Sequence, residues 1–304
     1  MARIGIVILN YITWKETKRC IESIKEAKTK HEFAIYVVDN ASPKIEELRE
    51  ICEKEDVTLI VNAFNIGYAA GNNVGIKRCL QDGCDYILIS NNDIVFKEES
   101  IDKLCEFLSK HEECGIVAPK ILDTEGNVQR CHFKKRMQYT DIWNTQTIFR
   151  FLRKRQVEKV YGTENFYKKN QELYASSGCC FMMSRRCAEE VTPLDEKTFL
   201  YEEENILGSK MEKKGWKTAY IVDAEVIHNH NQTGRLVKPF IFVCWACSEI
   251  YYCFEYLNVA KIKVWLLYLY RTVIFLLHAI KNKEFRKQWK YYCKNTQKYL
   301  KKQW

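Results

Sequence analysis

The chain has 304 residues, 47% of them apolar, which is enough for a large hydrophobic core and excludes an intrinsically disordered protein. Its formal charge of +9 is unevenly distributed. Residues 261–304 contain twelve Lys and Arg residues against one acidic residue, Glu284, so this segment carries +11 and residues 1–260 carry −2. The positive charge therefore belongs to a C-terminal segment, which also contains many aromatic residues. Such a mixture suits the surface of an anionic membrane or single-stranded nucleic acid.

The fourteen cysteines are scattered along the chain, and residues 4–9 are too short an apolar run for a secretory signal. We therefore expect reduced thiols and a cytoplasmic protein. Cys244 and Cys247 form a C-x-x-C pair without a second ligand pair, which favours buried thiols over a zinc or redox site.

Short β-branched segments alternate with helical segments over the first 120 residues, which is typical of a parallel sheet covered by helices. The expected strands are 4–9, 34–38, 58–61 and 86–90, and the expected helices are 17–27, 45–54, 69–80 and 100–109. The basic, aromatic stretch 123–172 breaks this pattern and predicts an irregular or helical insertion on the acceptor side. Beyond it we expect a strand at 177–183, a helix ending near 214 and a strand at 218–222.

Polar residues follow each of the first four expected strands. In open α/β sheets, ligands bind in the crevice at the carboxyl ends of the strands, so these residues are the candidates for a binding site. They are Asn10 and Tyr11, Asp39 and Asn40, residues 65–73, and residues 91–93.

Three of these polar segments read VVDNAS (37–42), NIGYAAGNNVGI (65–76) and SNND (90–93). Taken alone, Asp93 at the end of an apolar strand is either a ligand for a hard divalent cation or a turn residue. In this order and spacing the segments resemble those of family-2 glycosyltransferases of the GT-A fold. They are most similar to the bacterial rhamnosyltransferase-like branch that builds cell-surface polysaccharide. The resemblance runs from residue 4 to about 235 and is weakest in 123–172.

The resemblance implies a mostly parallel mixed sheet flanked by helices and a nucleotide-sugar donor bound along it. Asn10 and Tyr11 would border the base, and Asp39, next to Asn40, would bind the base or ribose. Further donor-binding residues would be Asn65, Gly67, Asn72, Asn91, Asn92 and Arg235. Asn91 stands where the family has the first acid of its Asp-x-Asp motif, so Asp93 is the only carboxylate of this motif that can bind the metal, Mg²⁺ or Mn²⁺.

The acidic cluster Glu202, Glu203 and Glu204 precedes Gly215 at a family-like distance. In an inverting transfer a carboxylate removes the proton of the acceptor hydroxyl. The resemblance places this base at Glu204, with Glu203 beside it and the weaker candidate. The simpler alternative is that acids favour the N-terminus of a helix, and both statements can hold together.

The resemblance also implies a second metal or diphosphate ligand at His228, followed by His230 and a loop with Arg235 that closes over the diphosphate. Gly178 and Cys179 stand where the acceptor approaches the donor sugar. A tight turn before a strand would require a glycine at the same position.

Residues 264–280 are nearly all apolar, but Arg271 lies in the middle. On a helix, Lys263, Arg271, His278 and Lys281 would form one polar stripe, which favours a helix lying in the membrane interface. A membrane span would pay roughly 2.5 to 3.5 kcal/mol for the central Arg. Packing against the catalytic domain or a second subunit remains the alternative. The expected domains are a catalytic domain, 1–235, with halves 1–120 and 121–235, and a helical, membrane-associating extension, 236–304.

The sequence therefore predicts an inverting, metal-assisted glycosyltransferase that uses a UDP- or dTDP-sugar and a glycan or lipid-linked oligosaccharide acceptor. We expect it on the inner face of the cell membrane, without a nucleic-acid partner, and a homo-oligomer is left open. Two alternatives are a nucleic-acid-binding protein that uses the basic tail and a sugar nucleotidyltransferase. The latter would need a glycine-rich, basic loop after the first strand, where residues 10–13 read NYIT. The same residues exclude a nicotinamide dehydrogenase, which needs G-x-G-x-x-G there.

Overall fold

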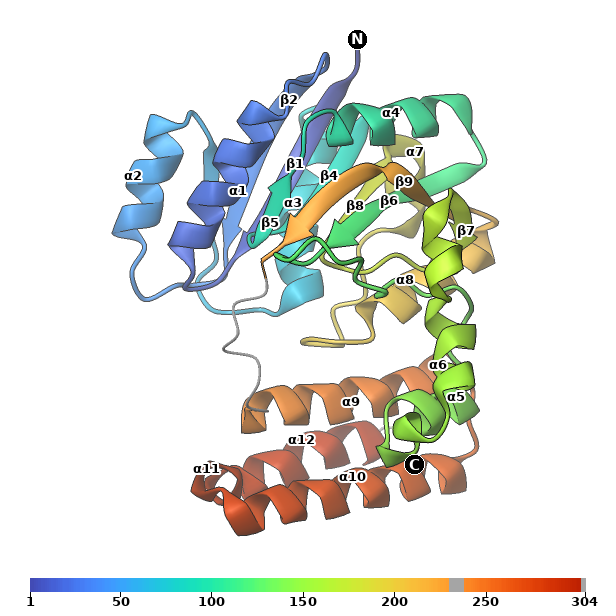
Figure 1. Ribbon diagram of the computed structural model, residues 1–304. Coiled ribbons are helices and arrows are strands. Elements are labelled where there is room, and N and C mark those ends of the chain that lie inside the picture. The colour runs from blue at the N-terminus through green and yellow to red at the C-terminus, as the bar shows by residue number, and fades with distance from the viewer. Residues whose placement is uncertain (230–237, 302–304) are drawn as a thin grey trace.

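The computed structural model describes residues 1–229 and 238–301 and contains a nine-stranded sheet above a layer of C-terminal helices (Figure 1). The strand order is β3-β2-β1-β4-β8-β6-β9-β5, with β7 paired to β9 off this path. The predicted mixed, helix-flanked sheet is therefore confirmed. The order places the polar ends of the first strands at one edge of the sheet, next to the helical layer.

The first four strands are parallel. They are β1 (Arg3–Asn10), β2 (Glu32–Asp39), β3 (Thr58–Val61) and β4 (Tyr86–Asn91). In this register Asn10 lies opposite Asp39, and Leu9 lies opposite Asn91. Because parallel strands end at the same edge, their polar ends form one cluster.

The other half of the sheet is mixed, and it was less visible in the sequence. It contains β5 (Ile94–Phe96), β6 (Cys114–Leu122), β7 (Gln171–Leu173), β8 (Cys180–Ser184) and β9 (Lys217–His228). Strand β8 is antiparallel to both β4 and β6, whereas β6 and β9 are parallel. Strand β9 extends six residues beyond the predicted 218–222, and this extension carries His228 to the cluster.

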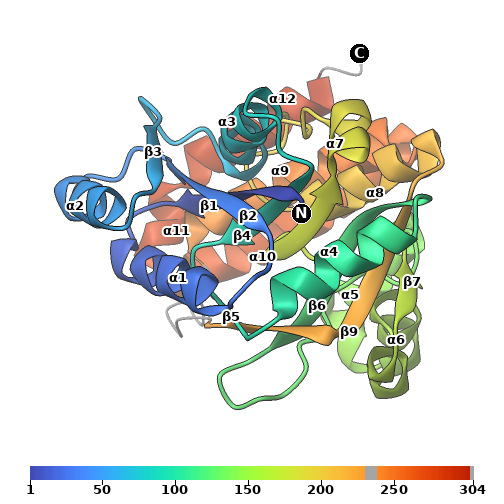
Figure 2. The ribbon, with the colours of Figure 1, turned by 90° about the horizontal axis from the view of Figure 1, so that it is seen from above.

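Helices cover both faces of the sheet (Figure 2). One face packs on α1 (Trp14–Glu26), α2 (Glu46–Lys54) and α4 (Ser100–Lys110), and the other on α3 (Tyr68–Gln81), α7 (Arg185–Val191) and α8 (Glu203–Lys214). Ile6 and Ile8 of β1 point to the first face and Val7 to the second, as the two-residue period of a strand requires.

The insertion and the C-terminal helices share one hydrophobic core. The insertion contains α5 (Tyr139–Thr145), η1 (Ile148–Phe151), α6 (Lys154–Tyr161) and η2 (Glu164–Lys168). The C-terminal helices are α9 (Pro239–Glu255), α10 (Lys261–Lys281), α11 (Lys283–Lys287) and α12 (Trp289–Lys301). Met137 and Ile142 lie in the same core as Ile250 and Phe275. The C-terminal helices are thus a packed part of the molecule.

Arg271 lies inside this core, so the expectation that it belongs to an exposed polar stripe on α10 was wrong. Its guanidinium donates two hydrogen bonds to the Glu249 carboxylate, at 2.7 and 2.5 Å, and one to the carbonyl of Gln146. It also stacks over the Trp245 ring, 3.9 Å from the ring centre. Arg271 and Glu249 are 2% and 0% exposed, so the charged residue faces the protein and pairs there.

We expect Arg271→Met to lower the free energy of unfolding by about 3–5 kcal/mol, because it leaves the Glu249 carboxylate buried without its cation. The double variant Arg271→Met, Glu249→Leu should recover most of this loss, since it removes both charges. Urea denaturation of the two variants and the wild type measures the difference. A loss under about 1 kcal/mol in the single variant would show that the buried pair does not matter for stability.

Candidate active site

Asn10 is the centre of a polar network at the carboxyl ends of β1, β2 and β4. Its side-chain nitrogen donates to Asp39 Oδ1 at 2.6 Å, and its side-chain oxygen accepts from Thr17 and from Asn92, at 2.8 and 3.0 Å. Ser42 completes the network by donating from its backbone and its hydroxyl to Asp39. Because both oxygens of Asp39 accept hydrogen bonds inside the protein, its carboxylate primarily orders the surrounding loops.

The predicted donor residues of this network differ in exposure. Asn10, Asp39 and Asn40 are at most 3% exposed, whereas Tyr11 is 47% exposed. The Asn40 amide donates to the carbonyl of Gly67 at 3.0 Å and therefore ties β2 to the next predicted donor segment. Tyr11 is the member of this group with a surface free to meet a base.

The segment 65–72 turns sharply into α3. Asn65 accepts a hydrogen bond from Gly67 N at 3.0 Å, and Gly67 has φ +91° and ψ −178°, a conformation open in practice to glycine alone. A Cβ on Gly67 would lie 2.6 Å from the Phe199 carbonyl oxygen, which accepts from Tyr68 N at 2.9 Å. Asn72 is buried in the first turns of α3 and donates to the Tyr68 carbonyl. This glycine lets the segment touch the loop that carries the acidic cluster.

Asp93, in the turn between β4 and β5, and His228, at the end of β9, come together. Asp93 Oδ1 lies 3.3 Å from His228 Nε2, and the other ring nitrogen of His228 lies 3.2 Å from Gln129 Oε1. Burial acts to lower the pKa of His228, but the carboxylate of Asp93 and the nearby Cys179 raise it, and the net pKa lies above the ordinary value. The structure therefore brings together the two residues that the sequence suggested as metal ligands, whose role as ligands stays a prediction.

The arrangement fits a divalent cation. Asp93 Oδ1 is buried and accepts no well-aligned hydrogen bond from the described residues, and Gln129 is placed to hold His228 Nδ1–H so that Nε2 faces Asp93. Such an outer hydrogen bond is a regular feature of metal-binding histidines. In residues 1–229 and 238–301 no three His, Cys, Asp or Glu side chains form a potential metal site. Two protein ligands suffice for Mg²⁺ or Mn²⁺ when substrate phosphates supply others.

The other residues of the SNND segment have separate surroundings. The Asn92 amide donates to the Thr13 hydroxyl at 2.7 Å and so ties β4 to the loop after β1. Asn91 is partly exposed, and its backbone N–H donates to the Cys179 carbonyl at 2.8 Å. Asn91 therefore lies at the border between the donor residues and the turn before β8.

The acidic cluster lies at the start of α8. Tyr201 and Glu202 both have left-handed backbones, with φ of 73° and 63°, which is strained for side chains of this size. Glu202 is buried and accepts from Asn205, whereas Glu203 and Glu204 are partly exposed. Burial and the charges of Glu249 and Glu204 raise the pKa of Glu202 to about 8. The strained turn separates Glu202, which points into the protein, from the next two acids.

Glu203 and Glu204 have different partners. Glu204 Oε1 accepts from Gly178 N at 3.2 Å, while Glu203 Oε2 is buried without a hydrogen bond from the described residues. Burial raises the pKa of Glu204, and the N–H of Gly178 opposes this rise; burial and the charge of Glu204 raise the pKa of Glu203 well above its ordinary value. Of the two carboxyls, Glu203 has the pKa that is raised further, and Glu204 is the one that accepts a hydrogen bond from Gly178 N.

Gly178 lies between the acids and Tyr68. The Tyr68 hydroxyl donates to the Gly178 carbonyl, and a Cβ on Gly178 would lie 3.1 Å from that hydroxyl and 3.3 Å from Glu204 Oε1. A side chain at this position would crowd both groups, and Cys179 beside the glycine is buried. Sequence reasoning did not single out Tyr68 or Gln129. Their partners are 110 and 99 residues away along the chain, and no local pattern marks them.

Two further predicted residues, His230 and Arg235, lie in 230–237, outside the described residues. The closing loop that the sequence suggested there stays a prediction.

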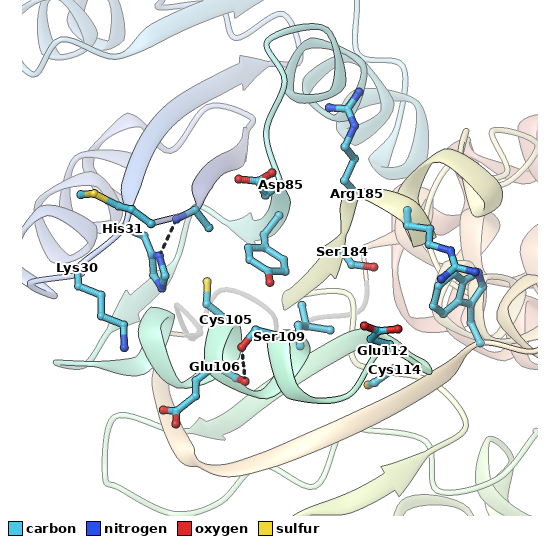
Figure 3. A pocket seen from close by; sticks show the side chains of 16 residues that line it. Lys30, His31, Asp85, Cys105, Glu106, Ser109, Glu112, Cys114, Ser184 and Arg185 are labelled. Carbon is cyan, nitrogen blue, oxygen red and sulfur yellow. Dashed lines mark hydrogen bonds between the residues drawn. The ribbon is translucent and has the colours of Figure 1, made fainter.

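Two of the cavities among the described residues differ in their position relative to the predicted site. One, of about 670 Å³, is at the amino ends of β1 and β4 and is lined by Lys30, His31, Asp85 and Arg185 among others (Figure 3). None of the predicted site residues that the structure describes lines it. The other, of about 1000 Å³, is largely apolar and borders Asn65 and Phe199. The second cavity shares its wall with the donor segment, whereas the first is at the opposite end of the sheet.

This mixed α/β fold, a central sheet flanked by helices, matches that of GT-A proteins. Among solved structures the chain is similar to GalNAc-T7, crystallised with UDP, GalNAc and Mn²⁺, with a TM-score of 0.60 and 14% identity. The similarity covers 83% of this chain but only 50% of that one, and it concerns the fold. The family model for Glycosyl transferase family 2 matches residues 4–192, and the chain belongs to this family. It is a glycosyltransferase, as the sequence predicted.

Two curated relatives agree with this assignment. N-acetylglucosaminyl-diphospho-decaprenol L-rhamnosyltransferase of Mycobacterium tuberculosis is 23% identical over 248 residues, which cover 76% of this chain and 77% of the relative. Low-salt glycan biosynthesis hexosyltransferase Agl10 of Haloferax volcanii is 26% identical over 228 residues, covering 74% of this chain and 67% of the relative. The predicted similarity to rhamnosyltransferases is thus confirmed, and the class of protein is a glycosyltransferase rather than a non-catalytic protein or a sugar nucleotidyltransferase.

Proposed function

We propose that this protein transfers a sugar, with inversion, from a UDP- or dTDP-sugar to a hydroxyl of a glycan or lipid-linked oligosaccharide in cell-surface polysaccharide synthesis. One observation carries the proposal. The turn at Gly178 and Cys179 accepts a hydrogen bond from the backbone N–H of Asn91, two residues before Asp93, and donates one to Glu204. The residues proposed for the leaving diphosphate and for the acceptor proton therefore meet at one turn.

The donor would lie along the carboxyl edge of β1, β2 and β4. Tyr11 would cover the base, and Asn65, Asn91 and Arg235 would contact the nucleotide sugar. Asn10, Asp39, Asn40 and Gly67 would act by ordering the loops, which their buried hydrogen bonds support. Asn72 and Asn92 would likewise hold the walls of the donor site.

Asp93 and His228 would hold Mg²⁺ or Mn²⁺, which when bound supplies positive charge to the departing nucleoside diphosphate. The chain itself contributes the orientation of the two ligands. Gln129 fixes the ring of His228, and strand pairing of Ile94 with His228 keeps both ligands at the end of β9. A rigid pair of this kind needs little reorganisation when the metal and donor bind.

Glu204 would act as the general base. Its Oε1 is held by Gly178 N, which leaves Oε2 to take the proton of the acceptor hydroxyl as that oxygen attacks C1 from the side opposite the diphosphate. Glu203, with its raised pKa, would hold a proton beside it and limit the negative charge of the pair. Gly178 and Cys179 would form the wall against which the acceptor lies.

The relatives and the C-terminal helices support the proposed acceptor and location. The mycobacterial relative is named for N-acetylglucosaminyl-diphospho-decaprenol, a lipid-linked compound, and this supports a lipid-linked acceptor here. We therefore place the protein at the inner face of the cell membrane, with residues 1–235 as the catalytic domain and 236–304 as its membrane-associating extension.

Thermal shift with a panel of nucleotides tests the proposal. UDP or dTDP should raise the melting temperature only with Mg²⁺ or Mn²⁺, because the diphosphate completes the metal's ligands. Hydrolysis of UDP-, dTDP- and GDP-sugars then identifies the donor. Stabilisation by an oligonucleotide, with no response to any nucleoside diphosphate, would contradict the proposal.

A further inference from the structure

We propose that the outer face of α10 and the neighbouring tip 148–152 form one surface that rests in the headgroup region of an anionic bilayer. This inference deepens the proposed function, since it identifies the face by which the enzyme would meet a membrane. Sequence reasoning assigned membrane contact to the C-terminal region as a whole and to a stripe containing Arg271.

The outer face of α10 is an uncovered apolar stripe. Seven of its large apolar side chains are between 44% and 72% exposed. At 100° per residue they fall within an arc of about 100°, the width of the apolar face of an amphipathic helix. These side chains are Ile262, Leu266, Leu269, Val273, Leu276, Leu277 and Ile280.

The opposite side of α10 is packed against the protein. Leu267, Phe275 and Arg271 are buried in the core with α9 and α12, and Figure 1 shows α10 on the side of the helical layer away from the sheet. By length and composition the helix could cross a bilayer. Only 28% of its most apolar segment is buried inside the protein. A span would require the Arg271–Glu249 pair and this packing to break. A helix that lies along the interface keeps them.

The tip of the insertion extends the same surface. Phe151 and Leu152 are 83% and 84% exposed, and Ile148 and Phe149 are exposed beside them. Ile148 N donates to the Tyr270 hydroxyl at 3.2 Å, and Trp143 packs on the Tyr270 ring. Tyr270 lies at the edge of the apolar arc of α10, so the two sets of apolar side chains are neighbours. Contiguous apolar patches of this extent mark protein or membrane contacts.

The charges around the surface favour lipid over a second copy of the chain. Exposed basic residues surround it at both ends of α10 and along the tip, namely Lys261, Lys263, Lys281, Lys283, Arg150, Arg153, Lys154 and Arg155. Long basic side chains of this kind reach lipid phosphates while their stems cover apolar surface. In a two-fold dimer through this face the same positive residues would face one another.

This orientation places the catalytic acids above the membrane. Ser248 of α9 donates to the Leu200 carbonyl in the acidic loop at 2.8 Å, so α9 lies between that loop and α10. Two helix layers separate the acids from the bilayer by roughly 20 Å. The reacting hydroxyl of a lipid-linked acceptor would have to stand well above the headgroups.

Flotation of the purified full chain with vesicles tests the surface. We expect co-flotation with phosphatidylglycerol-containing vesicles and much less with pure phosphatidylcholine. Leu266→Gln, Leu269→Gln, Val273→Gln together should weaken binding at least ten-fold, and Phe151→Gln, Leu152→Gln should weaken it as well. Lys263→Gln, Lys281→Gln should lower it about five-fold per lysine on the anionic vesicles.

Matched changes outside the surface are the controls. Lys213→Gln, Lys214→Gln on α8 and Val61→Gln on β3 change exposed residues of the same kinds and should leave flotation unaltered. The rate of donor hydrolysis without vesicles should be equal in all variants. The proposal of a membrane surface is therefore tested independently of the proposed catalytic function. The proposal would be overturned if the α10 triple variant floated with the vesicles as well as the wild type does. It would also be overturned if the wild type were a dimer and the triple variant a monomer.

Discussion

Glu204→Gln should lower the rate of sugar transfer by about 10³–10⁴, near the upper limit for removing a general base. Glutamine retains the size of the side chain and can still accept from Gly178 N at Oε1, so the turn before β8 should keep its geometry. Donor and metal binding should persist, because Glu204 is not among the residues proposed to hold the donor or the metal. Initial rates with the donor found by the hydrolysis screen, together with calorimetric titration of UDP or dTDP, measure both quantities.

Glu203→Gln is the matched control for this variant. Because burial and Glu204 raise the pKa of Glu203, this carboxyl is expected to be protonated already, and an amide should replace it with a loss under about ten-fold. Burial also raises the pKa of Glu204, so the wild-type rate should fall on the acid side at a higher pH than an ordinary glutamate would give. If the transfer rate fell more in Glu203→Gln than in Glu204→Gln, Glu203 would be the general base and Glu204 its neighbour.

Asp93→Asn should lower transfer by on the order of 10²–10³, because a metal that neutralises a leaving diphosphate contributes several kcal/mol and this variant removes one of its two protein ligands. The amide has the same shape as the carboxylate but no charge. Excess Mn²⁺ should therefore restore part of the rate. Titration of Mn²⁺ in the presence of the nucleoside diphosphate gives the affinity, and transfer rates at each metal concentration give the activity.

Gln129→Ala provides a graded comparison. It removes the hydrogen-bond partner of His228 without touching either proposed ligand, and loss of such a partner typically weakens metal affinity 10–100-fold. Saturating metal should return this variant to nearly full activity, whereas Asp93→Asn should remain impaired. An equal Mn²⁺ affinity of Asp93→Asn and the wild type would show that the metal binds elsewhere. Full wild-type activity in EDTA would show that the reaction does not use a metal.

Much of the structure of residues 1–120 could be predicted from the sequence. Strands β1 to β4 are marked by β-branched segments, and α1, α3 and α4 by apolar residues at helical spacing. Since the carboxyl ends of parallel strands share one edge, the proximity of Asn10, Asp39 and Asn91 followed from strand order. The hydrogen bond between Asn10 and Asp39 and the pairing of Leu9 with Asn91 agree with that inference.

The second half was harder because its strands are defined by distant partners. Strand β8 lies between β4 and β6, and β5 pairs with β9, which is more than 120 residues away along the chain. Short strands of this kind have weak local signals. The contacts of Glu204 with Gly178 and of His228 with Gln129 likewise depend on this topology, and periodicity could not predict them.

Helix α10 shows most clearly what each level decides. The apolar residues of the sequence determined that a long helix would form there. Local periodicity cannot predict which side of that helix another segment covers. The tertiary structure decided that question through Glu249, 22 residues earlier in the chain, which draws Arg271 into the core because a buried charge must be paired. The side left uncovered is therefore the apolar one, opposite to the polar stripe that the sequence alone suggested.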